Sequence, residues 1–67
     1  MFTRELKQAG HRKRFSISEV PGEGWEVREE TDSEPVRVLK YRDWHRVERA
    51  RMRIDAEVLD LKSRGWD

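Results

Sequence analysis

The chain has 67 residues, enough for one small domain, and 43% of them are charged while 34% are apolar. It contains no cysteine, which excludes disulfides and thiolate chemistry and favours an intracellular, cytoplasmic protein. The first residues lack an apolar signal core, and no stretch approaches the roughly 18 apolar residues of a membrane span, so neither an exported nor a membrane protein is predicted.

Residues 1–11 are predicted to form an N-terminal arm or a short extra element, which would be a fourth element beside three strands. Thr3 is a good N-cap residue, and one alternative is a short helix that runs from it to Gln8 and ends at Gly10. One or two turns of helix are marginal in water, so the other alternative is a loose arm.

Two β-strands are predicted next, because their apolar residues recur with a period of two. Phe15 and Ile17 share one side of the first strand, and Trp25 and Val27 share one side of the second. The segment Pro21–Gly24 between them combines a proline that fixes φ with glycines that tolerate positive φ. This composition is typical of a turn.

A third strand is predicted after a polar connection. Val36 and Val38 are expected to face the core. The residues that alternate with them, and are therefore expected to face solvent, are Arg37, Leu39 and Tyr41. Short connections between consecutive strands imply an antiparallel meander.

A long amphipathic helix is predicted from residue 44 onward. Asp43 is a good N-cap, since its carboxylate accepts hydrogen bonds from the free N–H groups of the first turn. Gly65 stands where a glycine commonly ends a helix, and Leu61 and Trp66 are then the apolar pair of a Schellman motif. One apolar stripe at helical spacing connects the two ends: Trp44, Val47, Ala50, Ile54, Val58 and Leu61.

Oppositely charged residues four positions apart are expected to add roughly 0.2–0.5 kcal/mol each to this helix. The three pairs are Arg51–Asp55, Arg53–Glu57 and Asp60–Arg64.

The predicted fold class is α+β. A three-stranded antiparallel β-meander is expected to pack against one long C-terminal α-helix, as a single β-β-β-α domain over residues 12–67. The alternating apolar side of the strands and the stripe of the helix are expected to form one core.

No catalytic constellation is present. His11 and His45 are the only histidines, no serine stands in a nucleophile-elbow context, and the carboxylates lie in turns or on the solvent side of the helix. We therefore expect a protein that is not an enzyme, with no cofactor, no metal and no small-molecule substrate.

Nucleic-acid binding is one functional hypothesis. The solvent face of the predicted sheet would offer guanidinium groups for phosphates and a ring for base stacking. Its candidate residues are Arg12, Arg14, Arg28, Arg37 and Tyr41. The architecture also resembles the arm-type DNA-binding domains of phage integrases, but none of that family's motif residues is found. Glu26 and Glu30 on the same face would repel phosphate, so a solvated charged face is the simpler interpretation.

Protein association is the competing hypothesis and the one we favour. Four large side chains are expected outside the core, on the sheet and on the helix: Leu39, Tyr41, Met52 and Leu59. Ala56 lies between the last two. This pattern predicts a small binding or adaptor protein with a modest interface, either for a homodimer or for another protein. Nucleic-acid binding is the alternative.

Three stretches of the chain carry a resemblance to known proteins. The stretches that carry it are Gly24-Trp25-Glu26-Val27-Arg28-Glu29-Glu30, Tyr41-Arg42-Asp43-Trp44-His45-Arg46-Val47-Glu48-Arg49-Ala50 and Gly65-Trp66. Over about residues 12–66 the chain resembles small bacterial proteins of uncharacterised function. The resemblance implies a bacterial, cytoplasmic protein with this sheet-plus-helix arrangement, and it brings no activity, cofactor or catalytic residue.

Overall fold

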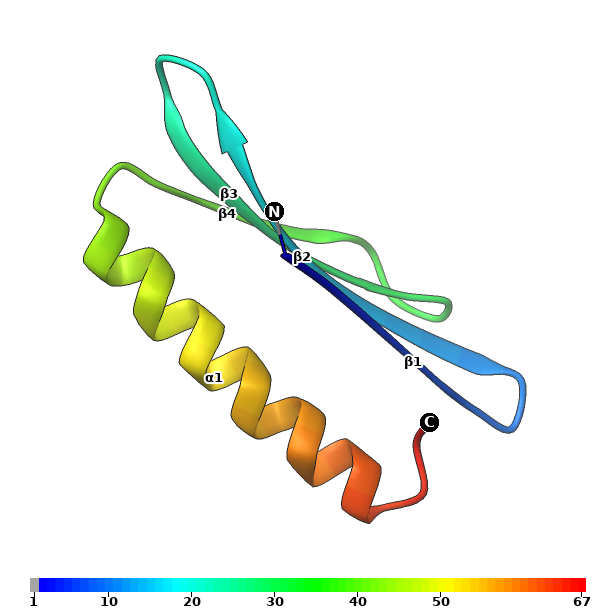
Figure 1. Ribbon diagram of the computed structural model, residues 1–67. Helices are drawn as coiled ribbons and strands as arrows, with labels where there is room; N and C mark the ends of the chain where they lie inside the picture. Colours follow the sequence, from blue (N-terminus) through cyan, green and yellow to red (C-terminus); the bar gives the residue numbers. More distant parts are fainter. Residues whose placement is uncertain (1) are drawn as a thin grey trace.

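The structure, a computed structural model, describes residues 2–67, so Met1 lies outside the described residues (Figure 1). Its elements are β1 (Phe2–Gln8), β2 (His11–Val20), β3 (Gly24–Thr31), β4 (Arg37–Tyr41) and α1 (Trp44–Ser63). Each strand pairs antiparallel with the next, in the order β1-β2-β3-β4. The α+β class and the meander followed by a C-terminal helix are confirmed, with four strands where three were expected.

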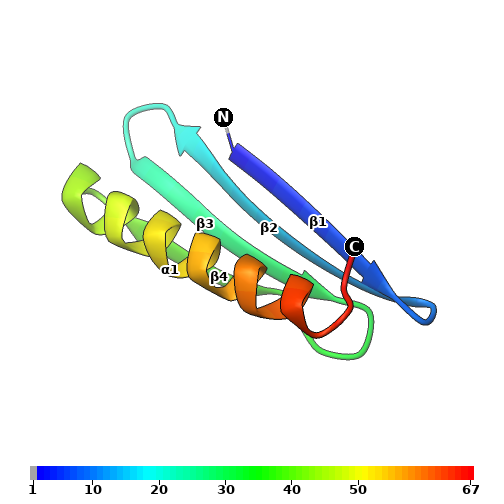
Figure 2. The same ribbon diagram turned by 60° about the horizontal axis from the view of Figure 1, so that its bottom comes forward.

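The helix lies across one face of the sheet. Figure 2 shows it running beside β3 and β4, with β1 as the far edge of the sheet. Across residues 2–67, no helix combines the length and the apolar character that a membrane crossing requires.

The short extra element considered for the N-terminal segment is a strand over residues 2–8, and neither the short helix nor the loose arm is formed there. β1 pairs with β2 from Phe2, opposite Ile17, to Gln8, opposite His11. Phe2 and Leu6 are buried on the side that faces the helix. β1 therefore belongs to the domain and adds to its core.

A two-residue turn closes the hairpin between β1 and β2. Ala9 and Gly10 have φ angles of 49° and 82°, the pair of positive values that a type I′ turn requires. This turn matches the right-handed twist of the flanking strands and holds β1 in register with β2.

The predicted turn between β2 and β3 is confirmed. The Glu23 N–H donates to the Val20 carbonyl at 2.9 Å, and Gly22 and Gly24 have positive φ. A Cβ atom on Gly24 would collide with the carbonyl oxygen of Tyr41, where the end of β4 passes the start of β3. Only glycine fits that position.

The side of β4 that faces the helix is the opposite of the one that was predicted. Leu39 lies opposite the buried Val27, and Tyr41 packs against the core. Val38 is 40% exposed, and Val36, which precedes β4, is 51% exposed. Because Val38 and Leu39 are neighbouring apolar residues, two alternations fit this segment, and the register with β3 decides between them.

Both helix ends are confirmed. The Asp43 carboxylate accepts the His45 N–H at 2.9 Å, and α1 begins at the next residue after this N-cap. At the other end, the Trp66 N–H donates to the Leu61 carbonyl at 3.1 Å, and Gly65, with φ of 100°, donates to the carbonyl three residues before it. These two bonds are the Schellman motif expected from the sequence.

One hydrophobic core fills the space between sheet and helix. Its buried residues are Phe2, Leu6, Phe15, Ile17, Val27, Val47, Ala50, Ile54 and Val58. Trp25, Tyr41, Leu61 and Trp66 pack at its border. Trp44 was expected inside, but it is 41% exposed because it lies at the side of the first helical turn, with its ring centroid 5.3 Å from that of Trp25.

Ion pairs between sheet and helix flank this core. Lys13 Nζ lies 2.9 Å from an oxygen of Glu57, and Arg53 lies 4.0 Å from an oxygen of Glu29. Both helical side chains reach the sheet, so the Arg53–Glu57 pair expected along the helix does not form.

Only one of the three expected helical ion pairs is present, between Asp60 and Arg64 at 3.2 Å. Arg51 does not pair with Asp55. Its guanidinium instead lies over the ring of Phe2, 4.9 Å from the centroid.

The last residues return to the edge of the sheet. Lys7 and Asp67 exchange two backbone hydrogen bonds of 2.9 Å each, and the Gln8 side chain donates to the Arg64 carbonyl at 2.9 Å. The C-terminal end of α1 is thereby tied to β1.

Candidate interaction surfaces

The face of the sheet that points away from α1 carries three of the five predicted nucleic-acid contacts. Arg12 and Arg14 alternate with core-side residues along β2, and Arg28 lies on β3 opposite Ser16. These three guanidinium groups share one face.

Arg37 and Tyr41 lie on the other side of the sheet, where the prediction was wrong. Their partners on β3 are Glu29 and Trp25, which are on the side that faces the helix. The predicted combination of arginines with a stacking ring therefore does not exist as one surface.

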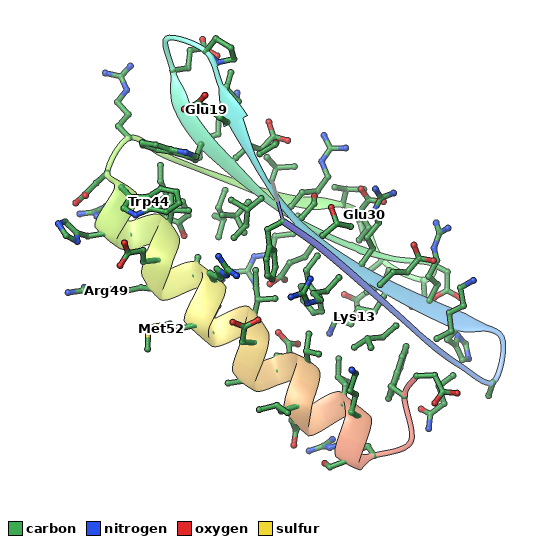
Figure 3. All side chains as sticks on the ribbon, in the orientation of Figure 1. Lys13, Glu19, Glu30, Trp44, Arg49 and Met52 are labelled. Carbon is green, nitrogen blue, oxygen red and sulfur yellow. The ribbon has the colours of Figure 1, made fainter. Side chains whose placement is uncertain are left out.

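Carboxylates neutralise much of the remaining basic face. Arg28 lies between Glu26, at 3.3 Å, and Glu30, at 3.7 Å, on its own strand. Arg14 has Glu30 opposite it on β3 and Glu5 opposite it on β1. Figure 3 shows Glu30 among nitrogen-bearing side chains on this face. Charges of both signs alternate here, so the potential offered to a phosphate backbone is weak.

The outer face of α1 carries the most exposed apolar side chains. Met52 and Leu59 are 72% and 71% exposed. At about 100° per residue they lie within about 20° of one another around the helix axis, and Met52 lies about 180° from the core-packed Leu61. Figure 3 shows Met52 and Arg49 pointing away from the sheet.

Two of the four residues predicted for a protein interface share one exposed surface. Met52 and Leu59 lie together on the helix with the exposed Ala56 between them. Leu39 and Tyr41 belong to the half-buried, helix-facing side of β4 and are not part of that surface.

Charged residues flank the exposed pair without being used inside the domain. Glu48 and Asp55 lie on one flank of Met52, and Arg49 lies on the other. None of these three, nor Lys62 near Leu59, takes part in an ion pair within residues 2–67. We call Glu48, Arg49, Met52, Asp55, Ala56, Leu59 and Lys62 the outer face of α1.

An open groove of about 490 Å³ runs between this helix and the first two strands. Met52 and Trp44 line its helix side, and Phe2 and Ile17 line its sheet side. The Phe2 ring is covered by two guanidinium groups, from Arg4 at 4.7 Å and from Arg51 at 4.9 Å. The groove is continuous with the outer face through Met52.

A second hollow of about 390 Å³ lies on the other side of the helix. It is lined by Tyr41, Arg46, Arg49, Ala50 and Arg53. This flank of α1 is consequently basic, whereas the flank with Glu48 and Asp55 also carries Arg51 and Lys62, so that charges of both signs lie there.

His11 and Asp32 form a polar pair at one end of the sheet, with a ring nitrogen of His11 3.2 Å from a carboxylate oxygen of Asp32. The loss of water contact raises the pKa of Asp32, but hydrogen bonds from its own backbone, from the Arg12 N–H and from His11 together hold this pKa below the usual 3.8. Both side chains are exposed, and no group of three or more potential metal-binding side chains converges within residues 2–67. The pair joins the β1–β2 turn to the loop after β3.

Comparisons of the chain with protein-family models, with curated proteins and with solved structures find no match. The resemblance to small bacterial proteins therefore stays an expectation, and the interpretation of function depends on the surfaces themselves.

The groove was missed from the sequence because β1 was not recognised as a strand. The charged flanks of Met52 could have been found by placing every helical residue at 100° intervals.

Proposed function

We propose that this protein is a small, non-enzymatic binding or adaptor protein that acts through protein association at the outer face of α1. The observation that carries the proposal is the exposure of Met52 and Leu59, which point away from the core of their own domain. We also propose that it acts in the cytoplasm, as the absence of cysteine suggests.

The free energy of burial supports this assignment. Covering a Met or Leu side chain stabilises a structure by about 1.5–3 kcal/mol, and two such side chains two turns apart on one face of a helix can be covered by one partner. Single exposed apolar residues are common on protein surfaces, but these two share one face of the helix on a chain in which 43% of residues are charged.

Site-specific photo-crosslinking in the native cell tests the proposal. A photoreactive amino acid in place of Ala56 should give covalent protein adducts, and the same group in place of Ser16, on the far face of the sheet, should give none. The double variant M52S/L59S should abolish the adducts while its thermal unfolding curve stays unchanged. Equal adducts from both positions, or none from position 56, would contradict the proposal.

Nucleic-acid binding through the sheet is the weaker candidate, because only Arg12, Arg14 and Arg28 share the face and carboxylates surround two of them. We expect no measurable affinity for mixed-sequence single- or double-stranded DNA at about 50 mM salt, where phosphate contacts are strong. Binding that weakens steeply with added salt would restore this alternative.

A further inference from the structure

We propose that the outer face of α1 binds a second copy of this chain, with the two helices antiparallel and Met52 packed against Leu59 of the second copy. This inference rests on the proposed function, since it names the partner for the same surface. It is carried by the way the charges of the helix are arranged along and around its axis.

Along the axis, the two halves of α1 have opposite charge. Residues 44–53 contain four arginines and one glutamate, whereas residues 54–63 contain three carboxylates and one lysine. Of these charged residues, Arg53, Glu57 and Asp60 also form ion pairs within the domain. An antiparallel copy places each basic half beside an acidic half. A parallel copy would place the arginines of one helix beside those of the other, which is unfavourable.

Around the axis, one flank supplies a matching pair. Glu48 lies one turn before Met52, about 6 Å along the helix, and Lys62 lies about 4.5 Å beyond Leu59. Around the helix axis, Glu48 is displaced by about 40° from Met52 and Lys62 by about 60° from Leu59, both to the same side. A twofold axis between antiparallel helices brings like flanks together, so Glu48 meets Lys62 of the second copy, and the pair occurs twice.

The other flank fits the same register. Arg49 and Arg53 lie about 4.5 Å before and about 1.5 Å after Met52, and Asp60 lies about 1.5 Å beyond Leu59 on this flank. Arg53 and Asp60 each also have an ion-pair partner within the domain, Glu29 and Arg64 respectively. Asp60 of the second copy therefore falls midway between the two arginines. The apolar pair Met52–Leu59, the pair Glu48–Lys62 and the group Arg49–Arg53–Asp60 fit one alignment, in which the numbers of facing residues sum to about 111.

One feature opposes the arrangement. The twofold axis passes near Asp55, which comes close to Asp55 of the second copy. A single helix pair also buries little surface compared with a stable dimer. We therefore expect a weak dimer with a Kd in the micromolar range, and we expect D55N to tighten it by about threefold or more.

Sedimentation equilibrium between about 5 and 500 µM with charge-reversal variants tests the register. E48K and K62E should each weaken the dimer at least tenfold, and E48K/K62E should return its Kd to within about threefold of the wild type. E23K, in the β2–β3 turn, gives the same net charge as E48K and should leave the dimer unchanged. Failure of the double variant to recover would overturn the proposed pairing.

Cysteine cross-linking tests the direction of the helices, because the chain has no cysteine of its own. In the antiparallel pair, the cysteine of A56C lies about 1.5 Å along the helix axis from the same cysteine of the second copy. The cysteine of S63C lies about 22 Å along the axis from its equivalent. We expect oxidation to give a disulfide-linked dimer from A56C and none from S63C, since a disulfide needs Cα atoms within about 7 Å. Cross-linking of S63C would overturn the antiparallel arrangement.

The failures of the two proposals are distinguishable. If the purified protein stays monomeric at all concentrations while crosslinks from position 56 in cells still depend on Met52 and Leu59, the second copy is excluded and the surface is retained for another protein. If these crosslinks are also absent, the proposed function fails as well.

Discussion

Gly24 shows how one missing side chain lets two strands pass each other. Its φ is 104°, and a Cβ atom would collide with the Tyr41 carbonyl oxygen, whereas Gly22, with φ of 76°, has open space around it. The sequence predicted a turn here from the residue types alone. Which of its glycines tolerates a side chain depends on β4, which is distant in the sequence.

We expect G24A to lower the free energy of unfolding by more than about 2 kcal/mol, because it combines the strain of positive φ with a backbone collision. G22A, the matched control, should cost only about 1 kcal/mol. Urea unfolding of both variants measures the difference, and equal costs would show that β4 does not approach β3 at this point.

Asp32 gives a pH dependence whose sign follows from its depressed pKa. A carboxyl group with a lower pKa in the folded state than in the unfolded chain stabilises the fold above its ordinary pKa, and this contribution is lost as the pH falls through the folded value. The unfolding midpoint of the wild type should therefore approach that of D32N as the pH falls below 3.8. A difference that stays constant over this range would contradict the ion-pair and hydrogen-bond geometry.

Among the elements, those with a strong local signal were predicted correctly. The stripe from Val47 to Leu61, the Asp43 cap and the Gly65 stop each involve residues within one or two helical turns, so the sequence alone contains the relevant interactions. The turn at Pro21–Gly24 is local in the same sense.

β1 and β4 were missed or reversed because their signals are not local. β1 has only two buried residues, Phe2 and Leu6, and Arg4 between them faces the same side and covers the Phe2 ring. An arginine at a core-side position hides the alternation. In β4, the adjacent Val38 and Leu39 allow either face, and only pairing with β3 selects one.

Leu6 tests whether β1 is part of the domain. It is 3% exposed, so we expect L6A to lower the free energy of unfolding by about 2–5 kcal/mol through lost burial and the cavity left behind. E5A, on the opposite face of the same strand, should change it by less than about 0.5 kcal/mol. A negligible effect of L6A in chemical denaturation would mean that residues 2–8 are a loose arm after all.

At the scale of the whole molecule, the distribution of charge decides which surface is suited to binding a partner. The net charge of +1 conceals an outward sheet face on which both signs alternate and a helix whose first half is basic and whose second half is acidic. Alternation favours a solvated surface, and segregation favours a partner with the reverse pattern. The sequence contains the charged residues of the sheet, but the face on which each one lies became known only from the register of the strands.

The candidate interface was likewise predicted correctly only where its residues depended on local periodicity. Met52 and Leu59 were predicted as exposed from helical periodicity alone, and the structure places them opposite the core. Leu39 and Tyr41 were predicted as exposed interface residues through the wrong face of β4. Because the nucleic-acid set depended on that face too, it lost Arg37 and Tyr41 for the same reason.

Amide chemical shifts followed by NMR during dilution from about 1 mM to about 20 µM test the central claim most directly. We expect concentration-dependent shifts on α1 at the outer-face residues, centred on Met52, Ala56 and Leu59, with Arg12, Arg14 and Arg28 unchanged. Shifts that instead map to the sheet face, or a spectrum that does not change with concentration, would contradict self-association through the outer face of α1.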